Sequence, residues 1–411
     1  MSDRDSGNRV GRRSFIAGAA AAGITIVKPS LVRGTQANST VDLGLIGCGG
    51  RGNWIIPLFQ DTKNGHYRFV ACCDYYQDHV DRTGDKLGIP ASRRYTTLSG
   101  YKRLIDSKLD AVVIETPPYF HPEQAAATVD AGKHVYLAKP IAVDVPGCKS
   151  IDASGRKATE MKLVFLVDFQ TRADKHYQEA VRRVHEGDIG RLVCGEARYP
   201  WGVGNFPGPA TPEDRLRRWY CYKALSGDFI IEQNIHTLDV ATWFINADPI
   251  QAVGIGGSKR LRSYGDIWDH FAVIFTFPSK EGSPFVLSYS GNQATPGAPN
   301  EIPCRIYGSR ATVDTDYYTH VWIHGDPKSG KPYDSGVFKD LYSTGTANNI
   351  RTFYQSIMEG NYSNPTVAPS VRSNLTCVMG RDAAYRGKPI TWDELMKSDE
   401  RLELDLTGLK A

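Results

Sequence analysis

The sequence has no apolar run long enough to span a bilayer. Its most apolar early segment, residues 15–27, holds roughly 12 apolar residues, whereas a spanning helix needs about 20. No later segment has an apolar run long enough to span a bilayer either. We therefore expect no transmembrane helix.

Cysteine pairs at metal-ligand or redox spacing are also absent, since no C-x-x-C occurs in the chain. Several cysteines lie in apolar contexts such as Val70-Ala71-Cys72-Cys73, which is typical of thiols packed as small apolar side chains. The eight cysteines are Cys48, Cys72, Cys73, Cys148, Cys194, Cys221, Cys304 and Cys377. We predict no metal site.

The body of the chain has no excess of charge of either sign. The first 37 residues carry six basic and two acidic side chains, which account for the formal net charge of +4. A neutral body argues against a nucleic-acid partner, which would require a basic surface. With 411 residues, 41% of them hydrophobic, the chain is long enough for two domains with sizeable cores.

The N-terminal basic residues precede the apolar segment. Arg12 and Arg13 are adjacent, Phe15 follows two residues later, and the apolar run extends to about residue 27. This combination is typical of a twin-arginine export signal. We predict a signal peptide at residues 1–37, a periplasmic or cell-envelope location, and the twin-arginine translocase as a partner during export. A cleaved signal, an uncleaved anchor and a plain basic tail are the alternatives.

From residue 41 the pattern alternates between short apolar runs and helical stretches. Expected strands cover residues 43–46, 67–73, 111–115, 134–137 and 163–169, and expected helices cover residues 51–60, 78–87 and 122–131. This alternation predicts an α/β fold with a doubly wound parallel sheet. We assign residues 38–170 to a Rossmann domain.

After residue 170 the strands follow one another without helices between them. Expected strands cover residues 192–199, 271–277, 285–290 and 304–307, and expected helices cover residues 173–186, 228–245, 349–359 and 371–386. Successive strands predict a large, mainly antiparallel open sheet. Residues 171–411 are therefore expected to form an α/β substrate-binding domain, whose late helices pack against either domain.

A glycine-rich turn follows the first expected strand. Residues 47–52 read G-C-G-G-R-G, which matches G-x-G-x-x-G, and Asp74 ends the next strand. Gly47 permits the tight turn, Gly49 lets the backbone approach a pyrophosphate, and Gly52 lets the helix pack closely. We predict cofactor contacts from this whole turn, Gly50 and Arg51 included. A carboxylate at Asp74 binds a ribose hydroxyl and repels a 2′-phosphate, so NAD is favoured over NADP.

Three further segments complete a recognisable set: residues 116–121 (TPPYFH), 131–140 (AGKHVYLAKP) and 232–239 (EQNIHTLD). Together with the glycine turn they resemble the glucose-fructose oxidoreductase, inositol dehydrogenase and MocA (Gfo/Idh/MocA) family, from about residue 41 to 392. The resemblance implies a sugar or polyol dehydrogenase or reductase with a cofactor that is tightly held in some members. We also expect a homo-oligomer.

The resemblance implies roles for residues that follow the middle strands. Thr116 and Pro117 are expected to contact the nicotinamide half of the cofactor, and His121 either caps the next helix or contacts a ligand. The family's Glu-Lys-Pro motif is Ala138-Lys139-Pro140 here. Lys139 follows a strand at the edge of the sheet where ligands bind, which makes it a catalytic and cofactor-binding candidate. Loss of the glutamate leaves its orientation and pKa open.

Glu232, His236 and Asp239 are spaced i, i+4, i+7, so on one helix they share a face about 60° wide. A carboxylate one turn before a histidine can fix its tautomer and raise its basicity. We expect Glu232 and His236 to be catalytic and Asp239 to lie behind them, near the substrate. A core histidine with an incidental acid is the alternative.

Arg172 and Trp201 are the remaining candidates for substrate binding. Arg172 comes directly after the last expected Rossmann strand, and Trp201 follows the first strand of the second domain. Arginine hydrogen-bonds hydroxyls or carboxylates, and aromatic faces stack on the C–H faces of sugars. Core packing or a subunit contact is the competing interpretation.

The leading hypothesis for function is hydride transfer between a nicotinamide and a sugar or polyol, with Lys139 or His236 as the base. An NAD-dependent glycosidase acting by transient oxidation and elimination would use the same cofactor and Lys139. A non-catalytic sugar-binding protein is the third alternative. The sequence does not indicate the substrate, the direction of reaction or the oligomer.

Overall fold

The computed structural model describes residues 39–201, 208, 211–259, 264–279, 282–293, 297–325 and 332–411. The chain divides into residues 1–40 and a compact unit of residues 41–411, and the fold below is that of the second unit. The predicted signal peptide lies outside the described residues. Within the described ranges, no helix has both the length and the apolar character needed to cross a membrane.

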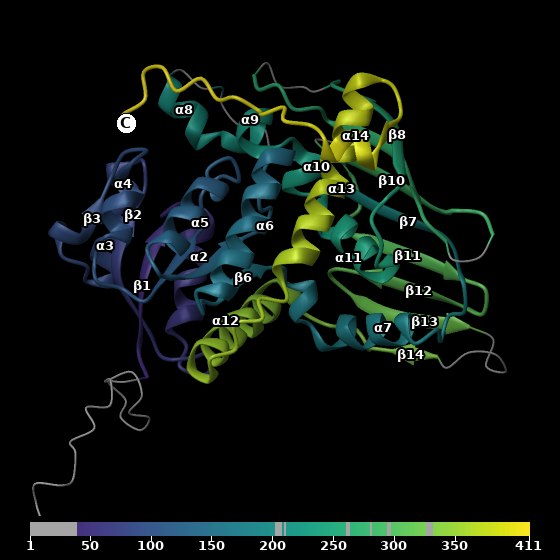
Figure 1. The fold of residues 1–411 in the computed structure, drawn as a ribbon, viewed down its shortest axis with the longest axis horizontal. Coiled ribbons are helices and arrows are strands. Elements are labelled where there is room, and N and C mark those ends of the chain that lie inside the picture. Colours follow the sequence, from purple (N-terminus) through teal and green to yellow (C-terminus); the bar gives the residue numbers. More distant parts are fainter. Residues whose placement is uncertain are drawn as a thin grey trace, which may run out of the picture. The chain divides into compact units, whose positions relative to one another are not determined.

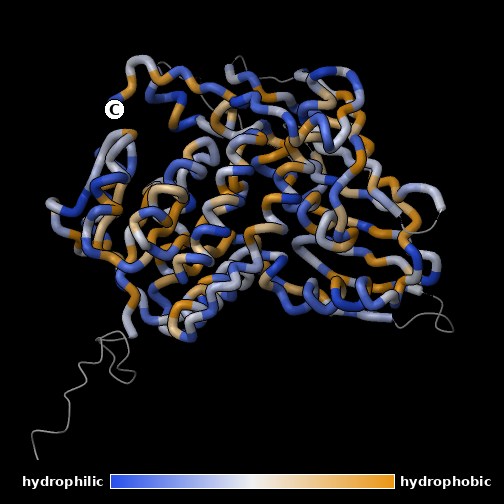
Figure 2. The backbone as a smooth tube through the Cα atoms, viewed as in Figure 1, coloured by the Kyte–Doolittle hydropathy of each residue, from blue (hydrophilic) through white to orange (hydrophobic). Residues whose placement is uncertain are grey.

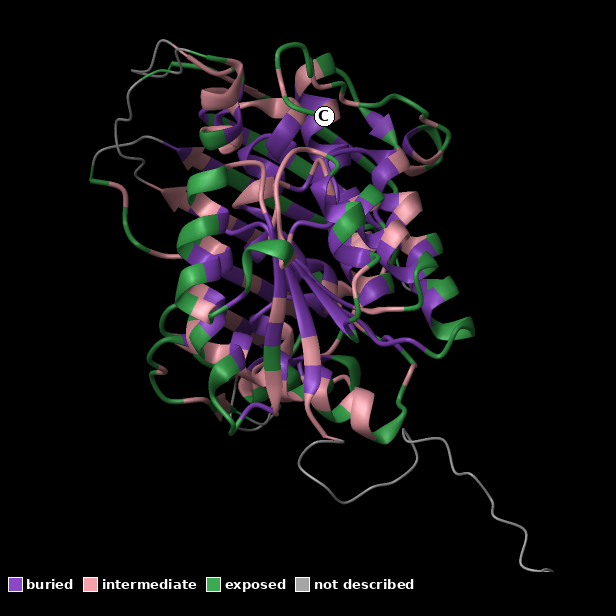
Figure 3. Ribbon diagram, turned by 90° about the vertical axis from the view of Figure 1, so that its left-hand side faces the viewer, coloured by how far each residue is buried: buried purple, intermediate pink, exposed green. Residues whose placement is uncertain are grey.

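Six parallel strands form the first sheet, in the order β3-β2-β1-β4-β5-β6 (Figure 1). The strands are β1 (Val41–Ile46), β2 (Tyr67–Cys73), β3 (Arg94–Tyr95), β4 (Ala111–Ile114), β5 (His134–Ala138) and β6 (Phe165–Asp168). Figure 3 shows that these strands are buried along most of their length, as expected where helices cover both faces. The strand order reverses between β1 and β4, which is where ligands bind in such sheets. The predicted doubly wound parallel sheet is confirmed.

Helices α2 (Gly50–Gln60), α3 (Gln77–Leu87), α4 (Gly100–Ile105), α5 (His121–Asp130) and α6 (Val145–Glu160) connect these strands. The sequence did not indicate α6, whose residues include several glycines and serines that weaken a helical pattern. Its first turn is held by Asp144, whose side chain accepts a hydrogen bond from the backbone of Gly147. Burial of Val145, Cys148 and Ile151 then stabilises the helix against the sheet.

Among the described residues, nine strands form the second sheet, in the order β14-β13-β12-β11-β7-β10-β9-β8-β15. They are β7 (Leu192–Trp201), β8 (Gln251–Gly257), β9 (His270–Phe277), β10 (Phe285–Gln293), β11 (Pro303–Gly308), β12 (Ala311–Asp316), β13 (His320–Gly325), β14 (Tyr333–Asp334) and β15 (Ile390–Thr391). The pairing is antiparallel except between β7 and β10. The predicted, mainly antiparallel open sheet is therefore confirmed, although β7 separates β10 from β11.

One face of the second sheet is covered by helices. Figure 1 shows α7 (Lys175–His185), α11 (Ile235–Ile245) and α13 (Val367–Arg386) on this side. Along β8, β9 and β10, buried and exposed residues alternate. The hydropathy does not follow this alternation throughout, because apolar residues also lie on the exposed face, and Figure 2 shows the hydropathy along the chain. The opposite face of these strands is therefore open to solvent in the single chain.

The expected helix at residues 228–245 is two helices, which corrects the sequence-based prediction. α10 (Phe229–Glu232) ends at Gln233, and α11 begins after Asn234. Asn234 is tied to the second sheet because its side-chain oxygen accepts a hydrogen bond from the hydroxyl of Tyr289. Glu232 and His236 therefore belong to different helices, and the helical spacing that placed them on one face does not apply.

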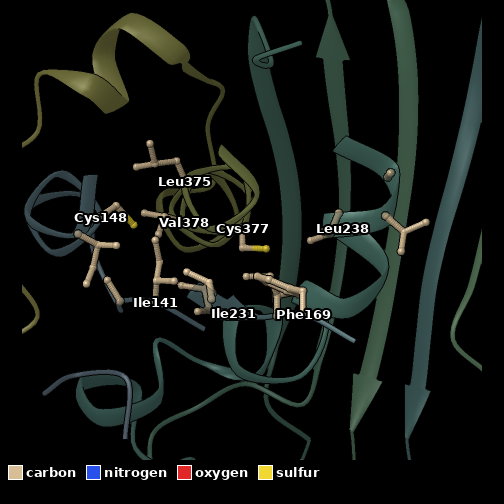
Figure 4. Close-up of a cluster of buried hydrophobic side chains, with 14 of the residues drawn as sticks. Ile141, Cys148, Phe169, Ile231, Leu238, Leu375, Cys377 and Val378 are labelled. Atoms are coloured by element: carbon tan, nitrogen blue, oxygen red, sulfur yellow. The ribbon is translucent and has the colours of Figure 1, made fainter. Parts of the chain in front are cut away.

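The last long helices pack against both sheets. Ile350 and Phe353 of α12 (Leu341–Glu359) join the core that covers one face of the first sheet, where Phe353 contacts Tyr136 edge to face. Figure 4 shows Cys377 and Val378 of α13 among apolar side chains from both halves. The predicted boundary at residue 170 thus falls between the last strand of the first sheet and the first strand of the second sheet. Helix α12, which comes later in the chain, packs against the first sheet.

Candidate active site

The glycine turn lies between β1 and α2 and requires its glycines for steric reasons. Gly47 has a φ of +95°, and a Cβ there would lie 2.6 Å from the backbone of Glu115. A Cβ on Gly52 would lie 1.9 Å from the carbonyl oxygen of Gly47. Around Gly49 and Gly50 a Cβ would meet no described atom within 4 Å. The N-terminus of α2 is therefore open to a phosphate group.

Asp74 comes directly after β2 and lies beside this turn. Its carboxylate accepts hydrogen bonds from the backbone N–H of Cys48 (2.7 Å) and of Tyr76 (3.0 Å). His79 lies 3.3 Å from the same carboxylate. Gly49, Asp74, Thr116 and Pro117 are among the residues that line a cavity of about 190 Å³, here termed the first cavity. An open helix N-terminus next to a carboxylate fits the pyrophosphate and ribose of a dinucleotide.

A second cavity of about 470 Å³ adjoins the first. Glu115, Thr116 and Trp219 line both cavities. The second cavity brings together Lys139, Glu232, His236 and Trp201, four of the residues singled out from sequence. Its wall also contains Tyr199, Tyr317, Tyr318 and Tyr342. Titratable side chains therefore meet aromatic rings in a space that communicates with the first cavity.

Lys139 extends from the end of β5 towards α10. Its Nζ donates a hydrogen bond to the carbonyl oxygen of Glu232 (2.7 Å) and lies 3.7 Å from the carboxylate of the same residue. The pKa of Lys139 is lowered, mainly because burial disfavours the charged amine, while the Glu232 carboxylate opposes this shift. The carboxylate that pairs with Lys139 thus comes from Glu232 of α10.

His236 lies in the first turn of α11 and is buried. Its Nδ1 has no hydrogen-bond partner within the described part of the chain, and its ring meets that of Tyr317 edge to face. Burial lowers the pKa of His236 well below its usual value, and the charge of Lys139 acts in the same direction. The imidazole is therefore neutral at neutral pH. The expected pairing of Glu232 with His236 is not what the structure shows, because Glu232 turns to Lys139.

Arg172 and Asp239 bind each other instead of lining either cavity. The Nε and Nη2 of Arg172 donate to the two carboxylate oxygens of Asp239 at 2.9 and 2.8 Å. The Asp239 side chain is 0% exposed, and the guanidinium lies over the ring of Trp243. This pair joins η4 (Thr171–Ala173) to α11, so the geometry gives no support to the substrate-binding role predicted for Arg172 and Asp239.

His121 lies between two carbonyl groups, of which its neutral ring can donate to one at a time, and it is neither a helix cap nor among the residues that line the two cavities. Its Nε2 is 2.7 Å from the carbonyl oxygen of Thr116, and its Nδ1 is 2.8 Å from that of Pro140. Burial lowers the pKa of His121 to about 4. The ring ties the loop after β4 to the loop after β5, and it thereby positions Thr116 and Lys139.

Arg51 points away from the first cavity and into the second. Its guanidinium contacts Asp168 at the end of β6 and approaches Glu115 after β4. Burial raises the pKa of Glu115 to about 8. Sequence reasoning missed both acids, although each is a charged residue at the end of an otherwise apolar strand, V-V-I-E and F-L-V-D. That signal could have identified them.

A Rossmann sheet with an open glycine turn, a carboxylate beside that turn and an adjoining cavity with a lysine and a histidine is the arrangement of a nicotinamide-dependent oxidoreductase. Residues 41–168 match the oxidoreductase family with an NAD-binding Rossmann fold, GFO/IDH/MocA, and residues 177–314 match the GFO/IDH/MocA C-terminal domain. The chain belongs to the Gfo/Idh/MocA family of oxidoreductases, and its cofactor is NAD.

Individual relatives agree with this assignment. Inositol 2-dehydrogenase from Rhizobium meliloti (strain 1021) is 25% identical over 352 residues, which cover 84% of this chain and 96% of the relative. A glycosyl hydrolase family 109 protein from Solibacter usitatus (strain Ellin6076) is 32% identical over 199 residues, 45% of this chain and 42% of that protein. The structure of levoglucosan dehydrogenase in complex with NADH and levoglucosan has the same fold, with a TM-score of 0.69, 17% identity, and coverage of 86% of this chain and 99% of that one.

Proposed function

We propose that this protein oxidises a hydroxyl group, or reduces a carbonyl group, of a sugar or polyol, using Lys139 and His236 for proton transfer. The observation that carries the proposal is that both side chains line one cavity of about 470 Å³, which adjoins the cavity at the glycine turn. When bound, NAD supplies hydride transfer at its nicotinamide ring. The inositol and levoglucosan dehydrogenases among its relatives support a polyhydroxylated substrate.

The protonation states suit a proton acceptor. His236 lines the second cavity and is neutral, so its imidazole can accept a proton from a substrate hydroxyl. Lys139 is held by Glu232 and its pKa is lowered, so its amine can share that proton. Thr116 and Pro117 border the first cavity, where they are expected to contact the nicotinamide half of the cofactor. Trp201 offers an aromatic face to a sugar ring.

The decisive experiment combines cofactor release with a substrate screen. Denaturing the purified protein and analysing the supernatant identifies any retained NAD. The native protein is then incubated with a panel of sugars and polyols, and both absorbance of the reduced nicotinamide and the products are followed. Oxidation of at least one polyol or aldose supports the proposal. Absence of any redox product across the panel, with NAD demonstrably bound, contradicts it.

A second candidate is glycoside cleavage through transient oxidation and elimination. The relative of 32% identity named as a glycosyl hydrolase family 109 protein favours it, although the match spans less than half of either chain. This reaction returns the cofactor to its starting state, so it releases a free sugar without net formation of reduced nicotinamide. Product analysis with an aryl glycoside therefore separates the two candidates.

We also propose export of the protein by the twin-arginine route to the periplasm or cell envelope, on the basis of the N-terminal arginine pair and apolar segment.

Self-association is proposed through the open face of β8, β9 and β10. That face carries the aliphatic side chains Val253, Ile255, Ile274 and Val286, of which Ile255 is 72% exposed. Light scattering should give a dimer or larger for the parent and a smaller species for Ile255→Lys. A monomeric parent would contradict this proposal.

A further inference from the structure

Glu115 directly after β4, Ala138 at the end of β5 and Asp168 at the end of β6 lie at the same level of three neighbouring strands. Ile114 pairs with Leu137 between β4 and β5, so Glu115 comes next to Ala138, and Ala138 pairs with Asp168 between β5 and β6. The Glu115 and Asp168 side chains are 0% and 1% exposed. A small residue therefore separates two buried carboxyl groups.

Arg51 extends from the first turn of α2 across this row. Its Nη2 lies 2.5 Å from Oδ2 of Asp168, and its Nε lies 3.6 Å from Oε2 of Glu115. Because these two carboxyl groups flank Ala138, a guanidinium that reaches both lies over the methyl group of Ala138. The glutamate that the Glu-Lys-Pro motif has at this position would compete with the guanidinium for space.

The guanidinium also contacts two aromatic rings and a hydroxyl group. It packs over the rings of Trp54 (4.3 Å) and Tyr342 (4.8 Å) and donates to the hydroxyl of Thr346 (3.2 Å). Its Nη1 is buried and has no hydrogen-bond partner within the described residues. Arg51 lines the second cavity together with Lys139 and His236. An arginine stays charged at any pH at which the protein is folded, so this is a fixed positive charge.

We propose, building on the proposed function, that Arg51 is a positioning residue for proton transfer: its fixed charge, held over Ala138, keeps Lys139 in the form that accepts a proton. A like charge nearby disfavours the protonated amine. Glu232 acts in the opposite direction, because its carboxylate favours the ammonium form. Arg51 thus offsets the effect of the carboxylate that anchors the lysine.

The pKa shifts of the surrounding groups agree with this arrangement. Arg51 lowers the pKa of Lys139 and of His236, in both cases after the larger effect of burial. Since burial raises the pKa of Glu115 to about 8, this carboxyl is mostly protonated at neutral pH and opposes the guanidinium little. The Asp168 carboxylate does oppose it, but its effect on the pKa of Lys139 is smaller than that of Arg51. The charged and titratable groups around Lys139 are Glu232 of α10, Arg51 of α2, Glu115 after β4, Asp168 of β6, His121 of α5 and His236 of α11.

The test is a direct titration of Lys139 that requires no substrate. The purified full-length protein is labelled with trace acetic anhydride at a series of pH values, and mass spectrometry of the peptide containing Lys139 gives the apparent pKa of its amine. Arg51→Gln should raise this pKa by about one unit, a tenfold loss of reactive amine at a fixed pH below it. Arg51→Lys, which keeps the charge, should leave the pKa within about 0.3 units of the parent.

Arg94→Gln is the matched control. Arg94 is a largely buried arginine of β3, at the far edge of the same sheet, and it pairs with Asp85. Its replacement removes one positive charge outside both cavities, so the pKa of Lys139 should not change. The proposal would be overturned if Arg94→Gln shifted the pKa of Lys139 as much as Arg51→Gln does. It would also be overturned if Arg51→Lys and Arg51→Gln shifted this pKa equally. An unchanged pKa in folded Arg51→Gln would likewise overturn it.

Two further measurements keep the proposal testable. If Arg51→Gln does not fold, Arg51→Met replaces it, because methionine keeps much of the apolar packing of the side chain but not its charge. It should also raise the lysine pKa, and an unchanged or lower value contradicts the proposal. Once a substrate is known, the acidic limb of kcat/KM should move to higher pH in Arg51→Gln and return in Arg51→Lys. A shifted lysine without any sugar or polyol turnover would refute the proposed function and leave the electrostatic effect of Arg51 established.

Discussion

Replacing His236 by glutamine removes a proton acceptor from the second cavity while keeping a polar side chain of similar length. A positioned acid or base contributes a factor of roughly 10² to 10⁴ in turnover, which corresponds to about 3–5 kcal/mol of the activation barrier. His236 does not line the first cavity, so NAD affinity should change little. Its Nδ1 has no described hydrogen-bond partner to lose, and the free energy of unfolding should fall by no more than about 2 kcal/mol.

The assay is steady-state kinetics with the best substrate from the screen, together with NAD binding followed by fluorescence. His134→Gln is the matched control, because His134 is also largely buried but lies at the start of β5, where its Nδ1 accepts a hydrogen bond from the backbone of Val164. This control should keep parental turnover. If His236→Gln retains turnover within about threefold of the parent at saturating substrate, the imidazole is structural and proton transfer rests with Lys139 or water.

The pH dependence of the parent enzyme tests the same assignment. A base must be unprotonated to act, and burial lowers the pKa of His236 well below 6.5. The rate should therefore hold between about pH 7.5 and 6.5 and decline only at lower pH. A decline centred on the usual histidine pKa would show that His236 is solvated in the working enzyme and that the electrostatic argument is wrong.

Other predictions concern the cofactor, export and stability. Asp74→Ser should weaken NAD binding and improve NADP binding relative to it, measured by titration with both nucleotides; equal affinities in the parent would refute the ribose contact. Arg12→Lys with Arg13→Lys should leave folded protein in the cytoplasm on cell fractionation, and continued export would refute the signal. Burial lowers the pKa of His134 to about 4, so the unfolded chain binds its proton first as pH falls. The parent should lose thermal stability between about pH 6.5 and 4, and His134→Gln should lose less; parallel melting curves would contradict this.

The parts of the site that depend on local sequence could be predicted. Gly47, Gly52 and Asp74 lie within one strand-turn-helix-strand unit, so spacing along the chain determines how they meet in space. Lys139 could be placed because it follows a buried strand, and the carboxyl ends of parallel strands share one edge of the sheet. Both sheets could also be predicted, because the pattern of apolar residues within each strand is a local feature of the sequence.

The parts that depend on distant contacts could not be predicted. The pattern from Glu232 to Asp239 fits a continuous helix, and only the bond between Asn234 and Tyr289 of β10 shows where the helix breaks. Arg172 was expected to meet a ligand, but Asp239, 67 residues away, occupies its guanidinium instead. In each case a side chain's partner comes from an element far along the chain.

The return of α12 to the first sheet limits how the polypeptide can be divided or assembled. A fragment ending near residue 170 would expose the apolar surface around Phe59 and Tyr136 that Ile350 and Phe353 cover in the whole chain. The first half is thus not a self-sufficient module, and the apolar core over this face of its sheet cannot be completed during synthesis until α12, in the last sixth of the protein, has left the ribosome. The proposed export route carries folded proteins. Export could therefore begin only after the whole chain has been synthesised and α12 has packed against the first sheet.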